Sequence, residues 1–314
     1  MNETAADHER QLAAPAGPLE LIAVAHVNDL WLKGEGGQRA HLSAHTFSHV
    51  AASQLHFGKA RFQGCALLSC ELENSNFEEA ELDHCDFSGT SLTEADFTGA
   101  SMVDVDFARV WMPRACFIEA VLTRVSLKRA TLDDSRFHDA RGIECSFYGA
   151  RLNNAHFHHS SFSASDFSST ELESAQFYDA GLLQCQVRNA EGARVNFTGA
   201  KLRSCEIVSS ELPFARFHHA DLTATQLVNS VLAEADFREA NLSGARFGRT
   251  CFEKARFGGA KMFAADLRGA DLTSARELTQ EQLSQALTDT NTILPNGKPG
   301  PYIRFSGAEK PLFR

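Results

Sequence analysis

A spacing of five residues runs through most of this chain without interruption. Of the 47 positions taken every five residues from Leu42 to Leu272, 44 hold Leu, Phe, Met, Val or Ile. The exceptions are Ala52, Gly142 and Gly192. An α-helix repeats its apolar face every 3.6 residues and a strand every 2, so neither element buries this pattern. The chain is therefore predicted to turn a corner at each repeat and to deliver each large residue to a common axis, as a solenoid does.

Phenylalanine indicates how many repeats close one coil. When the large positions are sorted into four classes modulo twenty, one class consists entirely of phenylalanine. Three or five repeats per coil would scatter these residues, whereas four repeats keep them in one column. The coil is therefore predicted to be square and to contain twenty residues. The predicted core column is Phe57, Phe77, Phe97, Phe117, Phe137, Phe157, Phe177, Phe197, Phe217, Phe237 and Phe257.

Short matches to A-(D/N)-(L/F) recur in this register, as in Ala95-Asp96-Phe97. The pattern resembles the motif of the pentapeptide-repeat family over about three quarters of the chain. The resemblance implies an all-β solenoid, a right-handed quadrilateral β-helix, with about twelve 20-residue coils over residues 40–273. In several repeats another residue precedes the central one, as at Arg136 and His156, which leaves the fold intact and changes the surface.

Open coils at the ends of a solenoid would template aggregation, so both ends need caps. Residues 1–20 are expected to be flexible. Residues 21–39 are expected to form the N-terminal cap with an apolar capping strand, because Ile22, Val27 and Leu32 continue the spacing of five.

Residues 274–314 are expected to form a C-terminal helical cap and a tail. Thr279 and Gln282 have the spacing of a capping box, which predicts a short helix over about 280–288. The tail from residue 300 is expected to pack on the rod or on a second subunit, and the latter would give a dimer through the C-terminal end.

Composition narrows the classes of partner and compartment. Forty acidic against thirty basic residues give a formal charge of −10, which argues against nucleic acid and favours a basic protein. The sequence has no apolar run long enough to span a membrane and no signal-peptide pattern at its start, so a cytoplasmic protein without a membrane partner is expected.

The cysteines and histidines offer candidate metal ligands. Six of the eight cysteines occupy the small inward position and are interpreted as replacements for Ala, whereas Cys116 and Cys251 are expected on the outer surface. His138, His156, His158 and other histidines point outward beside the Phe column, where neighbours could share a metal or a proton. An outward stack of polar side chains is favoured instead, because no cleft is expected there.

No catalytic motif or phosphate-binding loop occurs, and a filled rod offers no pocket for converging groups. The sequence therefore predicts no enzymatic activity, no metal and no cofactor.

Acidic residues are distributed unevenly around the predicted rod. The side centred on Leu72 and Leu92 carries twelve acids and four bases, and the side of the Phe column carries eight and four. The other two sides together carry ten acids and thirteen bases. Outward aromatic residues beside acids are typical of interface hot spots. The predicted protein-binding residues are Glu71, Glu73, Glu78, Glu79, Glu94, Asp96, Trp111, Asp133, Asp134, Glu171, Glu173 and Phe214.

The family resemblance implies two roles in which a rod resembles DNA. Some members protect topoisomerases from poisons, and others are immunity proteins that block secreted nuclease toxins. The unbroken register and the long rod favour immunity, through an acidic face that occupies a basic DNA-binding surface, with protection of DNA gyrase or another topoisomerase as the alternative. A structural scaffold or secreted effector is a second class, and an enzyme that uses the histidine-rich side is a third.

Overall fold

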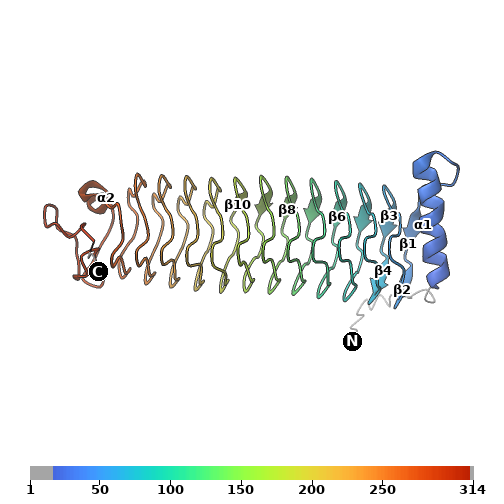
Figure 1. Ribbon diagram of the computed structural model, residues 1–314, viewed down its shortest axis with the longest axis horizontal. Coiled ribbons are helices and arrows are strands. Elements are labelled where there is room, and N and C mark those ends of the chain that lie inside the picture. The colour runs from blue at the N-terminus through green and yellow to red at the C-terminus, as the bar shows by residue number, and fades with distance from the viewer. Residues whose placement is uncertain (1–16, 312–314) are drawn as a thin grey trace, which may run out of the picture.

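The computed structural model describes residues 17–311 and shows a rod in which the chain winds around one axis (Figure 1). Each regular strand pairs in parallel with the strand twenty residues away, so that Leu42 lies beside Phe62 and Leu122 beside Gly142. Eight strands form one sheet in the order β1-β3-β5-β6-β7-β8-β9-β10, and β2 pairs with β4. The all-β solenoid and its coil of twenty residues are thereby confirmed. The strands are β1 (His41–Ser43), β2 (Thr46–Ser48), β3 (Arg61–Gln63), β4 (Ala66–Leu68), β5 (Glu81–Asp83), β6 (Ser101–Val103), β7 (Val121–Thr123), β8 (Arg141–Ile143), β9 (Ser161–Ser163) and β10 (Gly181–Leu183).

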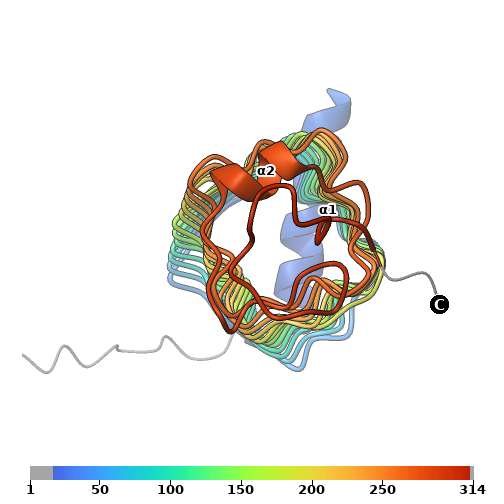
Figure 2. The same ribbon diagram turned by 90° about the vertical axis from the view of Figure 1, so that its left-hand side faces the viewer.

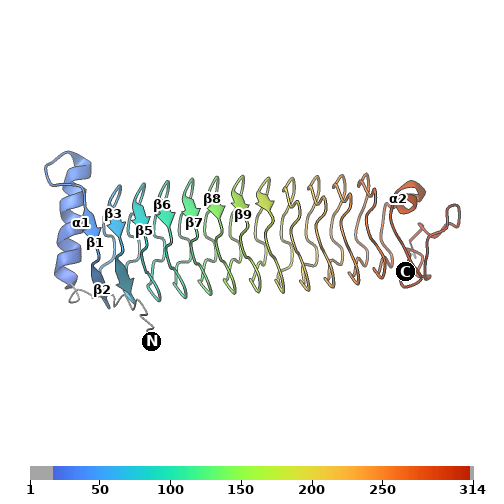
Figure 3. The same cartoon turned by 180° about the vertical axis from the view of Figure 1, so that it is seen from behind.

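The regular strands define about seven turns, fewer than the predicted number of about twelve coils. Beyond β10 the same pairing continues through isolated bridges, from Gly181–Lys201 to Asn241–Lys261. At Lys201 and onward this side has a single bridging residue followed by a tight turn, where the earlier coils have a three-residue strand. The difference lies in strand length, because the twenty-residue spacing persists along the rod (Figure 3).

The eleven phenylalanines of the predicted column stack along the axis. Each is at most 2% exposed, and successive ring centroids lie between 4.6 and 5.4 Å apart. Most of these rings are nearly parallel, as for Phe117 and Phe137 at 0°. Backbone bonds join neighbouring coils beside the rings, as where Phe97 N donates to the Cys116 carbonyl at 2.7 Å.

Where the large residue is missing, a neighbouring coil fills the space. A Cβ on Gly142 would lie 2.1 Å from Cδ1 of Phe162, so the ring of the next coil occupies the position that a side chain would take. A Cβ on Gly192 would meet the backbone carbon of Leu172 at 2.5 Å. Both glycines are therefore sites of close approach between coils.

The N-terminal cap is a helix, α1 (Pro18–Lys33), which lies across the end of the rod (Figure 1), and the predicted capping strand is wrong. Proline near its start and Gly34 in the left-handed region (φ 72°) at its end are typical helix boundaries. Ile22 and Leu32, which continue the spacing of five, are each 40% exposed, whereas Leu21 faces the core. Residues 18–20 of the segment expected to be flexible belong to α1, and residues 1–16 lie outside the described part.

Asn28 connects α1 to the first coils. This asparagine is fully buried. Its Nδ2 donates to the carbonyls of Gly58 at 2.9 Å and His56 at 3.2 Å, and its Oδ1 accepts from Ala40 N at 2.7 Å. The side chain thereby satisfies backbone groups that would otherwise be left at the end of the rod.

The C-terminal cap begins with α2 (Gln280–Gln285), shorter than the predicted 280–288. The capping box is confirmed: Gln282 N donates to Thr279 Oγ1 at 3.2 Å, and Thr279 N donates to Gln282 Oε1 at 2.8 Å. Nε2 of Gln282 also donates to the carbonyls of Phe257 and Ala260 at 2.8 and 3.0 Å.

The chain after α2 lies across the C-terminal end of the rod (Figure 2). Ala308 and Glu309 are buried there, and Tyr302 Oη donates to Glu309 at 3.3 Å. Ile303 and Phe305 remain mostly exposed. Within the described part of the chain, neither helix is both long and apolar enough to cross a membrane.

Candidate protein-binding face

Outward residues of one side of the rod form a continuous ladder, and we call this side the acidic face. Its bridging residues run from Glu71 through Ser91, Trp111 and every twentieth residue to Asp271. Each coil adds two further outward residues, which follow the buried central residue. Twelve acids and four bases lie at these positions.

The residues predicted to bind a protein all have accessible side chains. Glu71, Glu78, Glu79, Glu94, Asp134 and Glu171 are exposed, and Glu73, Asp96, Asp133 and Glu173 are half-buried. Trp111 is 52% exposed and Phe214 is 47% exposed.

The corner residue of each repeat has a left-handed backbone. Glu94, Asp134 and Phe214 have φ of 58°, 60° and 61°, a region that costs most L-residues energy. Hydrogen bonds between coils hold these corners, as where Glu94 N donates to the Pro113 carbonyl at 3.0 Å. The fold therefore fixes the direction in which these side chains leave the rod.

The four bases of the acidic face are paired with acids on the same face. Arg114 Nε lies 2.7 Å from Glu94, and Arg151 bridges Asp133 at 2.9 Å and Glu171 at 3.5 Å, from the coils on either side. Arg194 pairs with Glu173 in the same way, and Lys254 pairs with Glu253. Exposed ion pairs contribute little to stability and exchange readily. The acids still outnumber the bases, so a surplus of negative charge remains for a partner.

Hydrogen bonding keeps Glu73 ionised. Ser53 Oγ donates to its carboxylate at 3.0 Å. Partial burial opposes ionisation, but hydrogen bonds from Ser91 and Ser53 lower the pKa of Glu73 below its ordinary value. A carboxylate in this position is charged at neutral pH.

Asp96 differs from the other predicted binding acids because it precedes a buried central residue and its carboxylate binds the turn that follows. Its Oδ1 accepts from Thr98 N at 2.9 Å and from Thr98 Oγ1 at 2.6 Å. Two repeats earlier, Asp86 accepts from Ser88 N at 2.8 Å in the same way. An aspartate before the central residue thus stabilises the turn that follows it. The Asp or Asn of the A-(D/N)-(L/F) motif is the sequence feature that predicts this turn-stabilising role.

Negative charge extends onto the side of the Phe column only near the N-terminal end. Between residues 76 and 119 the outward positions of that side hold Glu78, Glu79, Asp96 and Glu119 and no Lys or Arg. Farther along this side, four arginines balance four acids. One of these arginines, Arg238, has its Nη2 2.6 Å from Asp236. The acidic surface therefore covers two sides of the rod over the first coils and only the acidic face beyond them.

Trp111 and Phe214 are the exposed aromatic residues of the acidic face. Trp111 bridges Ser91 and Thr131, and Phe214 lies at a corner five coils farther on. With one strand spacing per coil, the two rings are about 24 Å apart along the rod. A partner that touches both would cover the acids between them.

The two cysteines predicted to lie on the outer surface differ in exposure. Cys116, expected on the outer surface, is only 4% exposed, because Thr98 of the preceding coil lies over it with its Oγ1 3.1 Å from Sγ. Cys251 is partly exposed. The six inward cysteines are buried, and all eight are free thiols.

The structure also brings His138, His156 and His158 together, with one imidazole nitrogen of each within 4.8 Å of the others. Burial, followed by the neighbouring histidines, lowers the pKa of His158, and burial lowers that of His138 in the same way. Sequence reasoning placed these residues on one side of the rod but favoured a stack of separate polar side chains.

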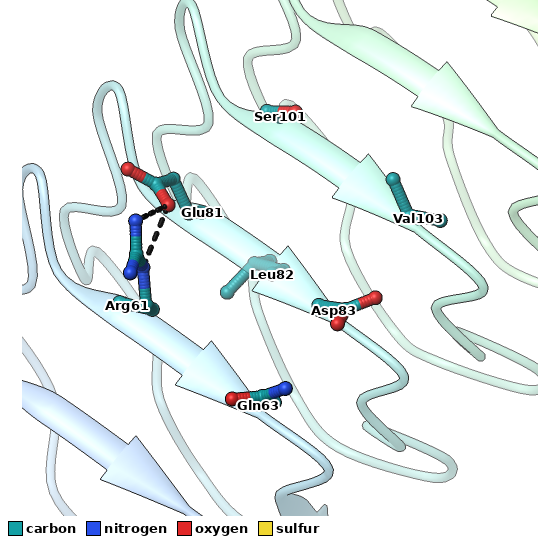
Figure 4. Close-up of a pocket in the computed structure, with 7 residues that line it drawn as sticks. All are labelled: Arg61, Gln63, Glu81, Leu82, Asp83, Ser101 and Val103. Carbon is teal, nitrogen blue, oxygen red and sulfur yellow. Dashed lines mark hydrogen bonds and ion pairs between the residues drawn. The ribbon is translucent and has the colours of Figure 1, made fainter.

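An open depression lies over the sheet on another side of the rod, between β3, β5 and β6 (Figure 4). Arg61 and Glu81 cross it, with Arg61 Nε donating to Glu81 at 2.7 Å, and Arg39 binds the same carboxylate at 2.8 Å. Hydrogen bonds from the two arginines lower the pKa of Glu81. Arg61 and Glu81 in this depression are thus paired with each other, and Asp83 at its edge pairs with His84 at 2.7 Å.

Comparison with solved structures finds other repeat proteins. HetL, a pentapeptide repeat protein involved in heterocyst differentiation regulation from the cyanobacterium Nostoc, is 24% identical over 78% of this chain and 94% of its own, with a TM-score of 0.35. A trypsin-treated form of QnrB1, a plasmid-mediated fluoroquinolone resistance protein, is 17% identical over 50% of this chain and 84% of its own, with a TM-score of 0.31. A pentapeptide repeat protein from the Arabidopsis thaliana thylakoid lumen is 24% identical over 44% of this chain and 68% of its own, with a TM-score of 0.19.

Family models describe the repeat itself. No curated protein matches the chain. The model of the pentapeptide repeat region matches residues 39–117, 60–137 and 135–212, and the model of eight pentapeptide repeats matches residues 215–253 and 240–276. Together they cover well over half of the sequence and follow the coils described above. The chain belongs to the pentapeptide-repeat family.

Proposed function

We propose that the protein is a non-enzymatic, protein-binding inhibitor that acts through the acidic face. The observation that carries the proposal is the ladder of outward acids, of which Glu71 and Asp134 are exposed and Glu73 is held ionised. Regular negative charge along a narrow rod resembles the phosphates of duplex DNA and attracts proteins with basic clefts.

The first candidate partner is a nuclease toxin, for which the protein would serve as the immunity protein. A rod with an unbroken register presents a straight acidic surface, which suits a cleft that otherwise accepts duplex DNA. DNA gyrase or another topoisomerase is the alternative partner. QnrB1 is described as a fluoroquinolone resistance protein, which is the observation that keeps this alternative in view.

Trp111 and Phe214 supply the apolar part of the proposed contact. Charge steers association and sets specificity, whereas exposed aromatic residues contribute much of the affinity at interfaces. Both rings sit among acids on the same side, so one partner can engage the two kinds of contact together.

Charge reversal on the acidic face tests the proposal. Two assays are run with the purified chain: DNA cleavage by a nuclease toxin encoded by an adjacent gene, and DNA supercoiling by gyrase. We expect inhibition and binding in one assay, and we expect reversal of five acids to weaken that binding about tenfold or more while thermal unfolding changes little. The reversed residues are Glu71, Glu73, Glu94, Asp133 and Asp134.

A matched variant reverses five acids on the other two sides and should keep the affinity of the unaltered protein. Equal affinity of all three proteins at low salt would contradict a role for the acidic face. Absence of binding in both assays would favour a scaffold. The control residues are Glu81, Asp83, Asp104, Glu144 and Glu206.

A further inference from the structure

Three histidines on the side of the Phe column form a cluster that the acidic face does not use. His138 and His158 occupy the same slot on successive coils, with parallel rings whose centroids lie 4.8 Å apart. The ring of His156 approaches both, at 5.7 Å from His138 and 5.4 Å from His158. The three side chains therefore face one small volume.

The backbone places these residues firmly. Phe137 N donates to the His156 carbonyl at 2.6 Å, and Asp139 N donates to the His158 carbonyl at 3.1 Å. These bonds belong to the regular pairing between coils, so they fix the relative positions of the three histidine backbones.

Two imidazole nitrogens in the cluster have no partner. Nε2 of His138 and Nδ1 of His156 are buried, and neither forms a hydrogen bond within the described part of the chain. A buried nitrogen without a partner costs free energy, which binding of a ligand at that atom would recover. The two atoms belong to adjacent coils and to two of the three clustered histidines.

We propose that His138, His156 and His158 bind one divalent transition-metal ion of the class that includes Zn²⁺, Ni²⁺ and Cu²⁺. Neutral imidazole is a preferred ligand of these ions and a poor one for Mg²⁺ and Ca²⁺. The candidate ligand atoms lie within 4.8 Å of one another, and a tetrahedral ion with Zn–N bonds near 2.0 Å needs about 3.3 Å between nitrogens. Small rotations of the three outward side chains close this difference.

Three histidine ligands leave the fourth position of a tetrahedral ion to solvent or to a partner. The charge nearby is mixed, since Arg136 and Asp139 both lie close enough to influence His138. Arg136 lowers the pKa of His138 and Asp139 raises it, so the two charges act on the cluster in opposite directions.

Titration of the purified full chain tests the site. We expect one Zn²⁺ per chain by calorimetry, one Co²⁺ per chain with the visible absorption of a tetrahedral ion, and no Ca²⁺ binding. His156→Ala should weaken Zn²⁺ binding about tenfold or more. Circular dichroism of the metal-free variant checks that the coils are intact. A second variant that combines His138→Gln with His158→Gln should also lose Zn²⁺ binding.

The matched control is His219→Ala. His218 and His219 form a close pair with ring centroids 4.0 Å apart, and His218 Nδ1 already contacts the Arg238 carbonyl at 3.0 Å. This variant should bind Zn²⁺ as the unaltered protein does. Zn²⁺ binding that survives His156→Ala, that is lost in His219→Ala, or that is absent from the unaltered chain would overturn the proposal. The acidic-face assays are independent of each of these results.

Discussion

The two ends of the rod solve one structural problem with different elements. At the N-terminal end a helix of sixteen residues, α1, lies across the first coils, and at the C-terminal end a helix of six residues, α2, precedes a tail. In both caps one side-chain amide reaches the terminal coil of the Phe column. Asn28 binds the carbonyls on either side of Phe57, and Gln282 binds the carbonyls of Phe257 and Ala260.

This comparison shows what a solenoid requires of any cap. A parallel ladder ends in a row of backbone groups that no further coil satisfies. Apolar cover alone would leave these groups buried and unpaired, so each cap supplies a carboxamide whose NH₂ group donates to two carbonyls of the terminal coil. The amide is therefore the shared feature, and the helix that carries it is free to vary.

The largest effect is expected from Asn28→Ala. The substitution leaves Ala40 N and the carbonyls of His56 and Gly58 without their buried partner. We expect a loss of about 3 kcal/mol in the stability of the first coils. Hydrogen exchange should show faster exchange at residues 40–60 and unchanged exchange beyond β10, and a uniform change along the rod would contradict the cap's local role.

A smaller effect is expected at the other end from Gln282→Ala. This side chain is 8% exposed, so water can replace part of what is lost. We expect the stability of the last coils to fall by about 2 kcal/mol, measured by hydrogen exchange at residues 257–276. Thr279→Ala removes the capping-box bond from Gln282 N to the Thr279 hydroxyl and leaves every bond of the Gln282 side chain possible. It should lower the stability of this cap by about 1 kcal/mol. Each variant removes one capping-box bond, so equal losses would contradict a stabilising role for the bonds from Gln282 to Phe257 and Ala260.

The smallest effect is expected on acidification, and it should differ between the ends. Asp289 Oδ1 accepts from Gly269 N and Thr292 N, each at 3.0 Å. Burial opposes ionisation, but hydrogen bonds from Gly269, Thr292 and Asn291 lower the pKa of Asp289 below its ordinary value. A lowered pKa means stability that is present above about pH 4 and is lost as the pH falls through the folded-state pKa.

Acid should therefore loosen the C-terminal cap before the N-terminal one. Asp29 also has a lowered pKa, chiefly through its hydrogen bond from Lys33 of the same helix. Its contact with the first coil is weaker, because His56 Nδ1 lies 3.7 Å from its carboxylate. Exchange at Gly269 and Thr292 should accelerate below about pH 4. Asp289→Asn should abolish this pH dependence, and its persistence in that variant would assign it to another group.

Periodic and local patterns in the sequence were sufficient for the solenoid and for one cap. The twenty-residue period predicts which residues pair, and the three-residue spacing of Thr279 and Gln282 predicts the capping box. Both signals rest on residues whose partners lie at a fixed and short spacing. The accessible positions of Trp111 and Phe214 follow from the same register.

Contacts between unrelated segments were not predictable in this way. Asn28 meets residues about thirty positions away, and α1 carries residues that match the spacing of five by coincidence. The proximity of His156 to His138 depends on side-chain rotamers across two columns, which periodicity does not describe. Cys116 is covered by one threonine of the preceding coil, so its outward slot alone did not decide its burial.

The uninterrupted pairing of residues twenty apart also determines on which side of the rod each residue lies. A residue's direction around the rod is set by its number modulo twenty, as the shared ladder of Glu71, Trp111 and Glu171 illustrates. Gain or loss of one whole coil would change the length of the rod and leave every face aligned. Gain or loss of a single five-residue repeat would turn everything beyond it by a quarter revolution and would split the acidic face in two. Evolution of rod length in this protein is therefore confined to steps that preserve rotational phase.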